Sequence, residues 1–298
     1  MSSSVDNVKI VPVNVLWKME QTEVLDFTSI LASGLGDKTL HIWSAKNAAK
    51  YYMWFKLDGA GTDPAPAGFT KIEVDIVSGD TPAQVATKVK NALNAVAGSP
   101  FKATVSDTIV TFMRTAVGET SLSVDVDSDV VISLSRRGRD YDLGLLEGDV
   151  GLDFKPKNFV LTAHQFGSSP LAALNQGLDK LECATTLLET QTAQLETLYN
   201  IYGGSVVPMG GTKVYGVGSA SQGKNMMVEA GRLVLKPVNA TDDTQNFNMM
   251  LAIPVPESLV FSGEKPRSLK VTWQGFVDRD FNSSFNAIAV GDVFQAGL

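Results

Sequence analysis

Apolar and polar residues alternate along much of this chain, and a period of two is typical of strands that bury one face. Near the start, Val13, Val15 and Trp17 alternate after Pro12, so we expect a strand within residues 5–20. Further strands are expected at 51–59, 71–79, 101–114 (a hairpin), 121–134, 148–165, 212–217, 231–238, 248–255 and 267–278. In the last of these, one face consists of Leu269, Val271 and Trp273.

One helix is expected directly after the strand at 71–79. Thr81 can cap its first turn, Pro82 suits the first helical position, and Gln84 completes a capping box. Gly98 is a typical residue for the end of such a helix. The apolar stripe of this helix consists of Val85, Val89, Leu93 and Val96.

A second and longer helix is expected at 171–204, where apolar residues recur at spacings of three, four and seven. These residues are Leu181, Ala184, Leu188, Leu195, Leu198 and Tyr202. Acidic residues recur every seven positions on another face, namely Glu182, Glu189 and Glu196. The pair Gly203-Gly204 is expected to end the helix.

The order of these elements predicts a discontinuous organisation. Residues 27–145 carry their own helix and their own apolar strands, which is typical of a small α+β domain. Residues 1–26 and 146–298 read as one β-rich domain with a single long helix, interrupted by that insertion. We therefore expect an α+β fold that is mainly β.

Composition narrows the class of protein. The chain has 298 residues, of which 44% are hydrophobic and 19% are charged, and this is typical of a folded globular protein. Cys183 is the only cysteine, so no intrachain disulfide can form. The net charge of −7 argues against a nucleic-acid-binding surface, although it suits a wall that DNA slides past. No apolar run approaches ~20 residues and the start resembles no secretory signal, so we expect no membrane insertion.

The stretch GSASQGKN at 218–225 contains most of a phosphate-binding loop. Gly218, Gly223 and Lys224 match the motif, but Asn225 replaces the hydroxyl residue that would hold Mg²⁺. A helix must follow such a loop, and the residues before Gly231 leave no room for one. The sequence therefore predicts a polar hairpin loop here and no nucleotide site.

Two charged clusters are candidate binding sites. Asp125, Asp127 and Asp129 alternate, so on a strand they would share one face and could bind Ca²⁺. They lack the glycine and the final glutamate of a calcium-binding loop, and a solvated strand face is the favoured interpretation. The stretch SRRGRD at 135–140 could hold a phosphate or a partner's carboxylates, but a linker that pairs with acidic neighbours is favoured.

Residues suited to catalysis are scattered. Cys183 falls near the apolar stripe of the long predicted helix, and His41 lies between apolar residues, so both are expected to be packed. His164 lies in a strand-to-loop stretch. The aromatic run YYMWF at 51–55 could stack on a sugar, but the core of a strand is favoured. We expect no enzyme, no catalytic residue, no metal site and no cofactor.

The C-terminal half resembles the tube-forming proteins of long-tailed bacteriophages and related contractile machines. The resemblance lies in the order of GDVGLDFKPKNFVLTAHQFGSSPL, a helix ending YNIYGG, TKVYGVG, GRLVLKPV, AIPVPESLVFSGEKPRSLKVTWQGFVD and AIAVGD. The opening VDNVKIVPVNVLW resembles the first strand of such subunits. The family implies a β-sandwich or half-barrel with one flanking helix, in rings of usually six subunits that stack into a hollow tube.

Residues 51–96 are similar to a small module that recurs in phage structural proteins and decorates the outside of a virion. Because an outward domain would clash with a contractile sheath, the pair of resemblances implies a non-contractile tail or a ring outside the sheath. The expected partners are further copies of the chain, other phage tail proteins, and DNA as non-specific cargo in a lumen. The expected location is the virion tail, after assembly in the host cytoplasm.

Other functions stay open at this point. A neck, terminator or baseplate ring of the same fold is the first alternative to the tail tube. The second is a carbohydrate-binding or adhesive module, which would use the 51–55 aromatics and the aspartates at 125–129 with Ca²⁺. The 203–225 stretch is a candidate for contact between stacked rings.

Overall fold

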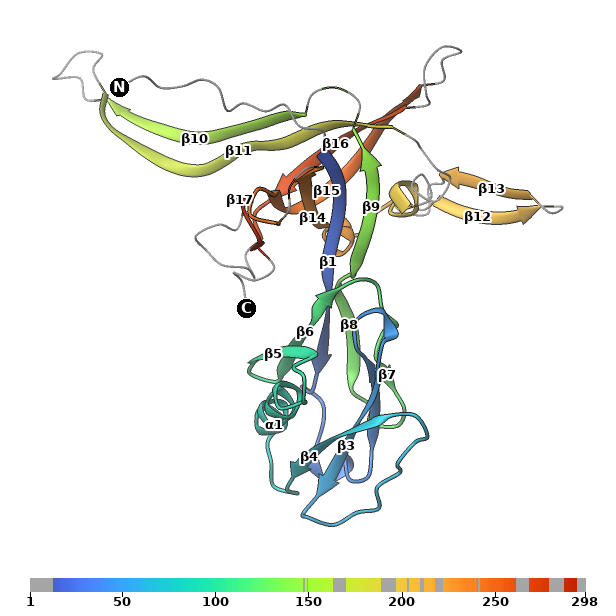
Figure 1. Ribbon diagram of the computed structural model, residues 1–298. Coiled ribbons are helices and arrows are strands. Elements are labelled where there is room, and N and C mark those ends of the chain that lie inside the picture. The colour runs from blue at the N-terminus through green and yellow to red at the C-terminus, as the bar shows by residue number, and fades with distance from the viewer. Residues whose placement is uncertain are drawn as a thin grey trace. The chain divides into compact units, whose positions relative to one another are not determined.

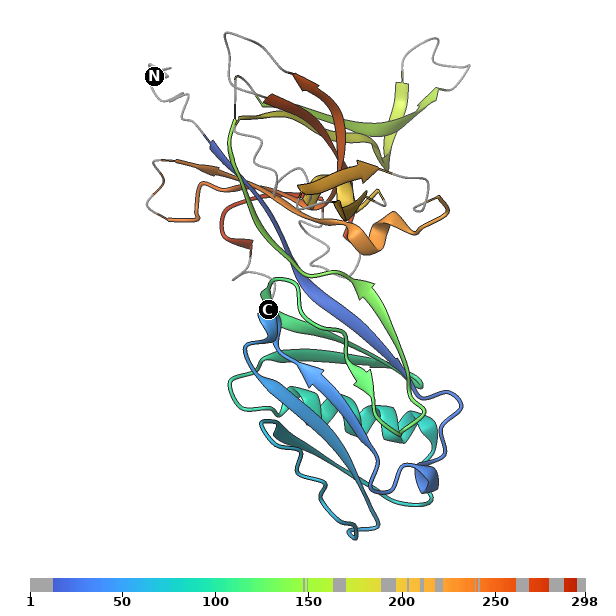
Figure 2. The same ribbon diagram turned by 90° about the vertical axis from the view of Figure 1, so that its right-hand side faces the viewer.

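The protein is mainly β in a computed structural model. The structure describes residues 13–146, 148, 150–162, 170–188, 197–202, 204–209, 212–217, 222–238, 240, 242–260, 268–278 and 287–293. These residues form an antiparallel sheet of eleven strands, a mixed sheet of four strands and a separate ribbon of two strands (Figures 1 and 2). Within the described residues no sheet closes into a barrel.

The chain divides into two compact units. Unit 1 comprises residues 1–17, 142–226 and 232–298, and unit 2 comprises 18–141 and 227–231. Strand β1 (Val13–Asp26) contributes residues to both units. The expected separate domain at 27–145, inserted between 1–26 and 146–298, stays a prediction about independent folding.

Unit 2 contains one helix, α1 (Pro82–Asn94), and most of the short strands. Its strands besides β1 are β2 (Thr39–Trp43), β3 (Lys50–Leu57), β4 (Thr70–Ile76), β5 (Phe101–Ser106), β6 (Ile109–Val117), β7 (Val124–Asp125) and β8 (Val131–Arg136). Strand β9 (Arg139–Leu145), like β1, contributes residues to both units. The mixed sheet has the order β4-β3-β2-β7, with β3 and β4 parallel. In the other sheet β1 pairs with β6 and with β8, and β6 pairs with β5.

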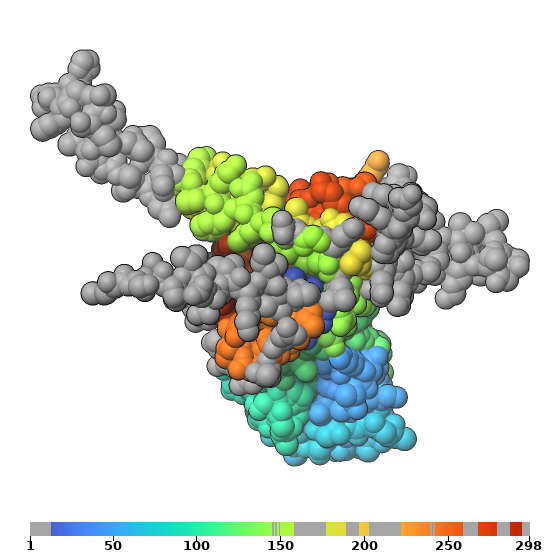
Figure 3. Space-filling model, turned by 45° about the horizontal axis from the view of Figure 1, so that its top comes forward, coloured from blue at the N-terminus to red at the C-terminus, as the bar shows by residue number. Residues whose placement is uncertain are grey.

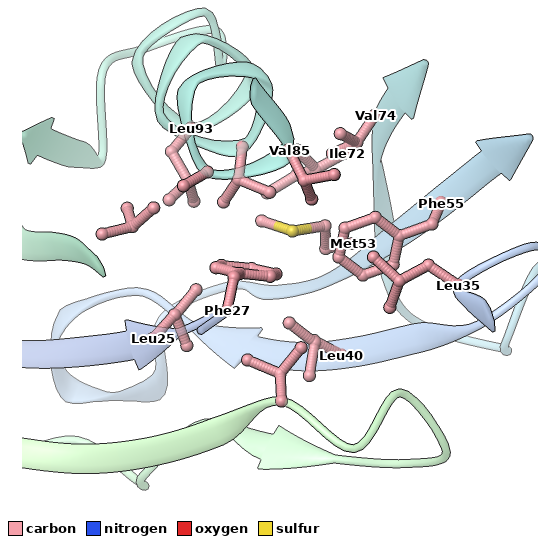
Figure 4. Packing of buried hydrophobic residues seen from close by; sticks show 14 of the residues in the cluster. Leu25, Phe27, Leu35, Leu40, Met53, Phe55, Ile72, Val74, Val85 and Leu93 are labelled. Atoms are coloured by element: carbon pink, nitrogen blue, oxygen red, sulfur yellow. The ribbon is translucent and has the colours of Figure 1, made fainter. Parts of the chain in front are cut away.

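The core of unit 2 lies between α1 and the strands (Figure 4). Met53 and Phe55 of β3 point toward Phe27, while Val85 and Leu93 of α1 cover them. The predicted start of α1 is confirmed, because Thr81 and Gln84 form both hydrogen bonds of a capping box. This cap satisfies backbone groups that the first helical turn leaves open.

Unit 1 is built from antiparallel strands. They are β10 (Gly151–Thr162), β11 (Pro170–Leu188), β12 (Gly204–Met209), β13 (Thr212–Val217), β14 (Gly231–Pro237), β15 (Phe247–Val260), β16 (Ser268–Phe276) and β17 (Ile288–Val290). The longest of them are β10, β11 and β15. The predicted apolar face of β16 is confirmed, since Leu269, Val271 and Trp273 are all fully buried. Trp273 meets Trp17 edge to face, with ring centroids 6.0 Å apart.

The long helix expected at 171–204 is the main error of the sequence analysis. Residues 170–188 form strand β11 instead. Its buried residues alternate, as Leu181, Cys183, Thr185 and Leu187, so the period of two prevails over the helical spacing. Pairing with β10 on one side and β16 on the other supplies the backbone hydrogen bonds of this segment. Residues 189–196 lie outside the described residues, and only 197–200 form a helical turn.

The hairpin of β10 and β11 extends beyond the rest of its sheet (Figure 1). Strand β11 pairs with β10 from Pro170 to Ala184, but with β16 only from Glu182 to Leu188. Strands β12 and β13 form a second ribbon that is separate from the large sheet. Two-stranded ribbons are marginally stable alone, so both ribbons depend on other contacts for support.

A buried ion pair lies inside unit 2. Glu23 and Arg114 are both fully buried, and Arg114 Nη2 lies 2.8 Å from Glu23 Oε1. Arg114 Nε donates to the carbonyl of Trp43 at 3.1 Å. Burial lowers the pKa of Arg114 and the charge of Glu23 opposes that change, which leaves the guanidinium charged at neutral pH.

The same carboxylate also binds backbone of the segment that follows β6. Glu23 Oε2 accepts a hydrogen bond from the amide of Ser123 at 3.1 Å, and Gln21 Oε1 accepts one from the amide of Thr120 at 3.1 Å. Gln21 donates in turn to Glu23 Oε1 at 2.8 Å. These two side chains therefore bind backbone amides of residues 120–123, which precede β7.

Removing one member of the ion pair is expected to destabilise the protein. Glu23→Gln and Arg114→Met should each lower the free energy of unfolding by about 3–5 kcal/mol, because each leaves an uncompensated buried charge. The double variant should lose less than the sum of the two single losses. Urea unfolding followed by circular dichroism measures this, and single losses below about 1 kcal/mol would contradict it.

Candidate functional site

The loop resembling a nucleotide-binding loop has no helix after it. Residues 222–223 form a turn, with Gly223 at a φ of +80°, and only a 3₁₀ turn at Met226–Glu229 separates it from β14. A phosphate site of this kind needs the N-terminus of a following α-helix. The structure has a turn at 222–223, but the predicted hairpin is wrong, because β13 pairs with β12 and β14 pairs with β1 and β15. Gly218 lies outside the described residues.

The aspartates at 125–129 do not share a strand face, so that prediction is wrong. Strand β7 ends at Asp125, and the following residues turn, with Asp129 at a φ of +60°. The carboxylate of Asp125 accepts hydrogen bonds from the amides of Ser128 and Asp129 at 2.8 and 2.9 Å. The carboxylate of Asp127 accepts one from the amide of Thr39 at 2.8 Å. These carboxylates therefore shape the turn.

The arginines of SRRGRD pair with acidic neighbours, as the favoured interpretation expected. Arg137 Nε lies 3.1 Å from Glu229 Oε2, and Arg137 Nη1 lies 3.0 Å from Glu119 Oε1. Arg139 also forms an ion pair with Glu229, and the side chains of both residues are buried. A Cβ on Gly138 would lie 1.9 Å from the carbonyl oxygen of Gly118, so this position requires glycine.

The aromatic run at 51–55 is packed on both sides, which confirms the prediction of a strand core. Met53 and Phe55 lie in the core of unit 2, while Tyr52 and Trp54 on the other face are only 3% and 4% exposed. Tyr52 donates to Asp63 Oδ1 at 2.7 Å, and Asp63 lies in the loop that precedes β4. The run offers no open platform for a sugar.

The hydrogen bond from Tyr52 to Asp63 makes the stability of the loop before β4 depend on pH. Burial raises the pKa of Tyr52 to about 12, and the bond to Asp63 adds to the rise. The hydrogen bond from Tyr52 lowers the pKa of Asp63, and Lys71 at 3.3 Å lowers it further. A carboxyl with a lowered folded-state pKa stabilises the fold above its ordinary pKa, and this stabilisation is lost as the pH falls through the folded-state value.

We expect Asp63→Asn to weaken the pH dependence of stability in acid. The melting temperature of the unmodified protein should fall more steeply than that of the variant below about pH 4, where an aspartate of ordinary pKa begins to protonate. Asp75→Asn is the matched control, because the side chain of Asp75 is 74% exposed on β4. Parallel curves for the unmodified protein and Asp63→Asn would contradict the coupling.

The candidate catalytic residues His41 and Cys183 belong to different units of the chain. His41 is half-buried against the ring of Phe69, with centroids 4.3 Å apart, and burial lowers its pKa. Trp43 packs edge-on against both rings. His164 lies outside the described residues. Cys183 is fully buried in β11 opposite Trp273, which is a strand position and not the helical one expected.

The thiol of Cys183 is expected to be unreactive in the folded protein. Burial raises its pKa to about 12, so almost none of it is thiolate at neutral pH. A chromogenic disulfide reagent at about pH 8 should label it only after denaturant is added. Labelling of the native protein at the rate of a free thiol would show that β11 does not cover this residue.

Sequence reasoning missed the buried polar residues Gln21, Glu23 and Glu229. Gln21 and Glu23 occupy the inward positions of β1, in line with Trp17, Met19 and Leu25. That alternation was visible in the sequence and could have marked them as buried polar residues. The role of Glu229 was not visible, because its partners are about 90 residues away along the chain.

No protein-family model, no curated protein and no solved structure matches the chain. In the described residues, no three His, Cys, Asp or Glu side chains gather where they could hold a metal ion. None of the helices in that part of the chain is both long and apolar enough to cross a membrane.

The surface that stands out is the unpaired edge of β10. Among the described strands β10 is the last in its sheet, and only β11 pairs with it. Leu152 and Phe154 are 44% and 48% exposed, and they alternate with the charged residues Asp153 and Lys155. The strand is yellow-green in the space-filling view and lies at the surface (Figure 3). An edge strand with apolar side chains is a template for another chain.

Cross-strand ion pairs hold the charged face of this hairpin. Lys180 Nζ lies 2.9 Å from both Asp153 Oδ2 and Glu182 Oε2. The hydrogen bond from Lys180 lowers the pKa of Asp153, and the two carboxylates raise the pKa of Lys180. Lys155 lies farther from Asp153, at 3.6 Å, and its side chain is 60% exposed. Its ammonium is the more accessible charge on this face.

Proposed function

We propose that this protein is a structural protein of a bacteriophage tail, whose subunits form a closed ring around a channel for DNA. The observation that carries the proposal is the ribbon of β12 and β13, whose strands pair only with each other in the described chain and leave both outer edges open. A β-protein with such an edge needs a cover for it, and pairing between subunits supplies one. The edge of β10 in the large sheet is a further open margin among the described strands, which a contact outside the ring can cover.

The resemblance of the C-terminal half to tube-forming phage proteins supports this assignment. Unit 1 is a mainly β body with long antiparallel strands, as a subunit of a β-sandwich or half-barrel would be. The flanking long helix of that family has no counterpart at 170–188. The proposal therefore rests on the strand order and the open edges, with six subunits as the expected ring size.

The net charge of the chain is −7, but residues 21–149, with 12 basic and 17 acidic residues, account for −5 of it, so the net charge alone does not argue for an acidic channel wall. A ring closes when each subunit presents two different surfaces to its neighbours. A neck, terminator or baseplate ring of the same fold would use the same contacts, and it is the alternative position within the tail.

The residues that suggested a carbohydrate-binding or adhesive role are buried or make hydrogen bonds within the protein. Tyr52 and Trp54 are buried under the loop before β4. Asp125 and Asp127 accept hydrogen bonds from backbone amides in their own turn and in β2. We therefore do not propose that role.

Negative-stain microscopy and native mass measurement of the purified protein test the proposal. At rising concentration we expect rings with a central hole, and short stacks of rings if the subunit belongs to the tube itself. A particle that stays monomeric over the whole range, with and without other tail proteins from the same phage lysate, would contradict the proposal. Rings that never stack would favour the neck, terminator or baseplate position.

A further inference from the structure

The outer edge of β10 is complementary to itself. Its described side chains read Leu152, Asp153, Phe154, Lys155 and Pro156, with an acidic and a basic residue on either side of one aromatic residue. In an antiparallel pair, residues directly opposite each other lie on the same face of the sheet. A second copy of this strand, turned by 180° about Phe154, therefore brings each Asp153 opposite a Lys155.

Only one register gives this match. If the two-fold axis passed through Asp153 or Lys155, two like charges would face each other, which is destabilising. A shift by one residue would place charged side chains against the apolar face, because the side-chain period of a strand is two. With the axis at Phe154, both charge pairs are opposite in sign and Leu152 faces Pro156 of the second copy.

The exposed apolar residues of β10 also favour pairing with a second copy of the strand. Leu152 lies opposite Cys183 and Phe154 lies opposite Leu181, so both extend the buried face of β11. Cys183 and Leu181 are 0% and 5% exposed, whereas Leu152 and Phe154 remain about half exposed. A second β10 would continue this face across the edge and cover both side chains.

We propose that two copies of the protein pair through β10, antiparallel and in register, with Phe154 on the two-fold axis. The partner is a second copy of this chain because the charges of the strand match themselves. Pro156 has no N–H group and so limits the ladder at each end of the paired stretch. The paired stretch is therefore short, from Leu152 to Pro156 on each copy.

This contact differs from those that close a ring. A two-fold contact uses the same surface on both copies, whereas a ring uses two different surfaces. The inference therefore does not rest on the proposed function. Where rings form, the β10 contact would join two rings face to face, and without rings it would give dimers.

Single-cysteine cross-linking tests the register directly. In Phe154→Cys the two thiols would face each other, with Cα atoms about 4.5–5.5 Å apart, which is within the range for a disulfide. Mild oxidation should therefore give a covalent dimer on a non-reducing gel. The unmodified protein is the first control, since its only cysteine, Cys183, is buried.

Leu152→Cys is the matched control on the same strand and the same face. Its two thiols would be four residues apart along the paired strands, at about 13 Å, so we expect no dimer. A mixture of Leu152→Cys and Pro156→Cys should cross-link, because these positions face each other. Equal cross-linking of Leu152→Cys and Phe154→Cys would overturn the register, and no cross-linking of a folded Phe154→Cys would overturn the contact.

Charge variants in the Phe154→Cys background test the electrostatic match. Adding Asp153→Lys or Lys155→Glu separately should reduce the dimer yield several-fold, because each homodimer then opposes like charges. Mixing these two variants should restore the yield, since both pairs in the mixed dimer are again opposite in sign. A mixture no better than either variant alone would contradict the pairing.

Ring formation is scored separately in each variant. Rings without cross-linking would leave the proposed function standing and remove the β10 contact. Cross-linked dimers without rings would do the reverse. Circular dichroism and melting temperature confirm that each variant folds, and Val290→Lys on β17, where the side chain is 74% exposed, is the control for an added surface charge in unit 1.

Discussion

The buried ion pair between Glu23 and Arg114 is the constraint on which unit 2 depends. Two charges without solvent contact are costly, and their mutual attraction and hydrogen bonds offset part of that cost. Here the carboxylate serves the guanidinium, the side chain of Gln21 and the amide of Ser123 together. It thereby connects strands β1 and β6 to the backbone of Ser123, which directly precedes β7. The two sheets of this unit are held together by polar contacts as well as by the apolar core under α1.

The sequence predicted elements well where local signals and burial agree. The helix α1 has a capping box and a buried stripe, and β16 has a clear alternation, so both were recognised. The β11 segment carries two patterns at once, since Leu181 fits a helix with Ala184 and Leu188, and a strand with Cys183 and Leu187. Neighbouring strands decide between these patterns, and their pairing is not readable from a single segment. The turn at Asp125–Asp129 was misread for a similar reason, because its hydrogen bonds are local but follow no period.

The candidate site was less predictable than the fold. Conventional signals, such as a glycine-rich loop, clustered aspartates and a lone cysteine, turned out to be structural. The remaining candidate is the outer edge of β10. Whether a strand lies at the edge of its sheet depends on which other strands pair with it, and the strand's own sequence does not show this. Its residues look like those of any amphipathic strand. The self-complementary order of Asp153, Phe154 and Lys155 gains meaning only once the strand is known to lie at the end of its sheet.

The contacts of Glu23 also bear on how the chain acquires its structure during synthesis. The hydrogen bond from Ser123 joins residues 100 positions apart, and the bond between Gln21 and Thr120 spans 99. Contacts between distant residues slow folding, because a long loop must close before they form. On the ribosome, the first strand of unit 2 therefore emerges with a charged residue at an inward position and waits for about a hundred more residues. Until then β1 has no stable partner, and the nascent chain is at its most vulnerable to aggregation and proteolysis.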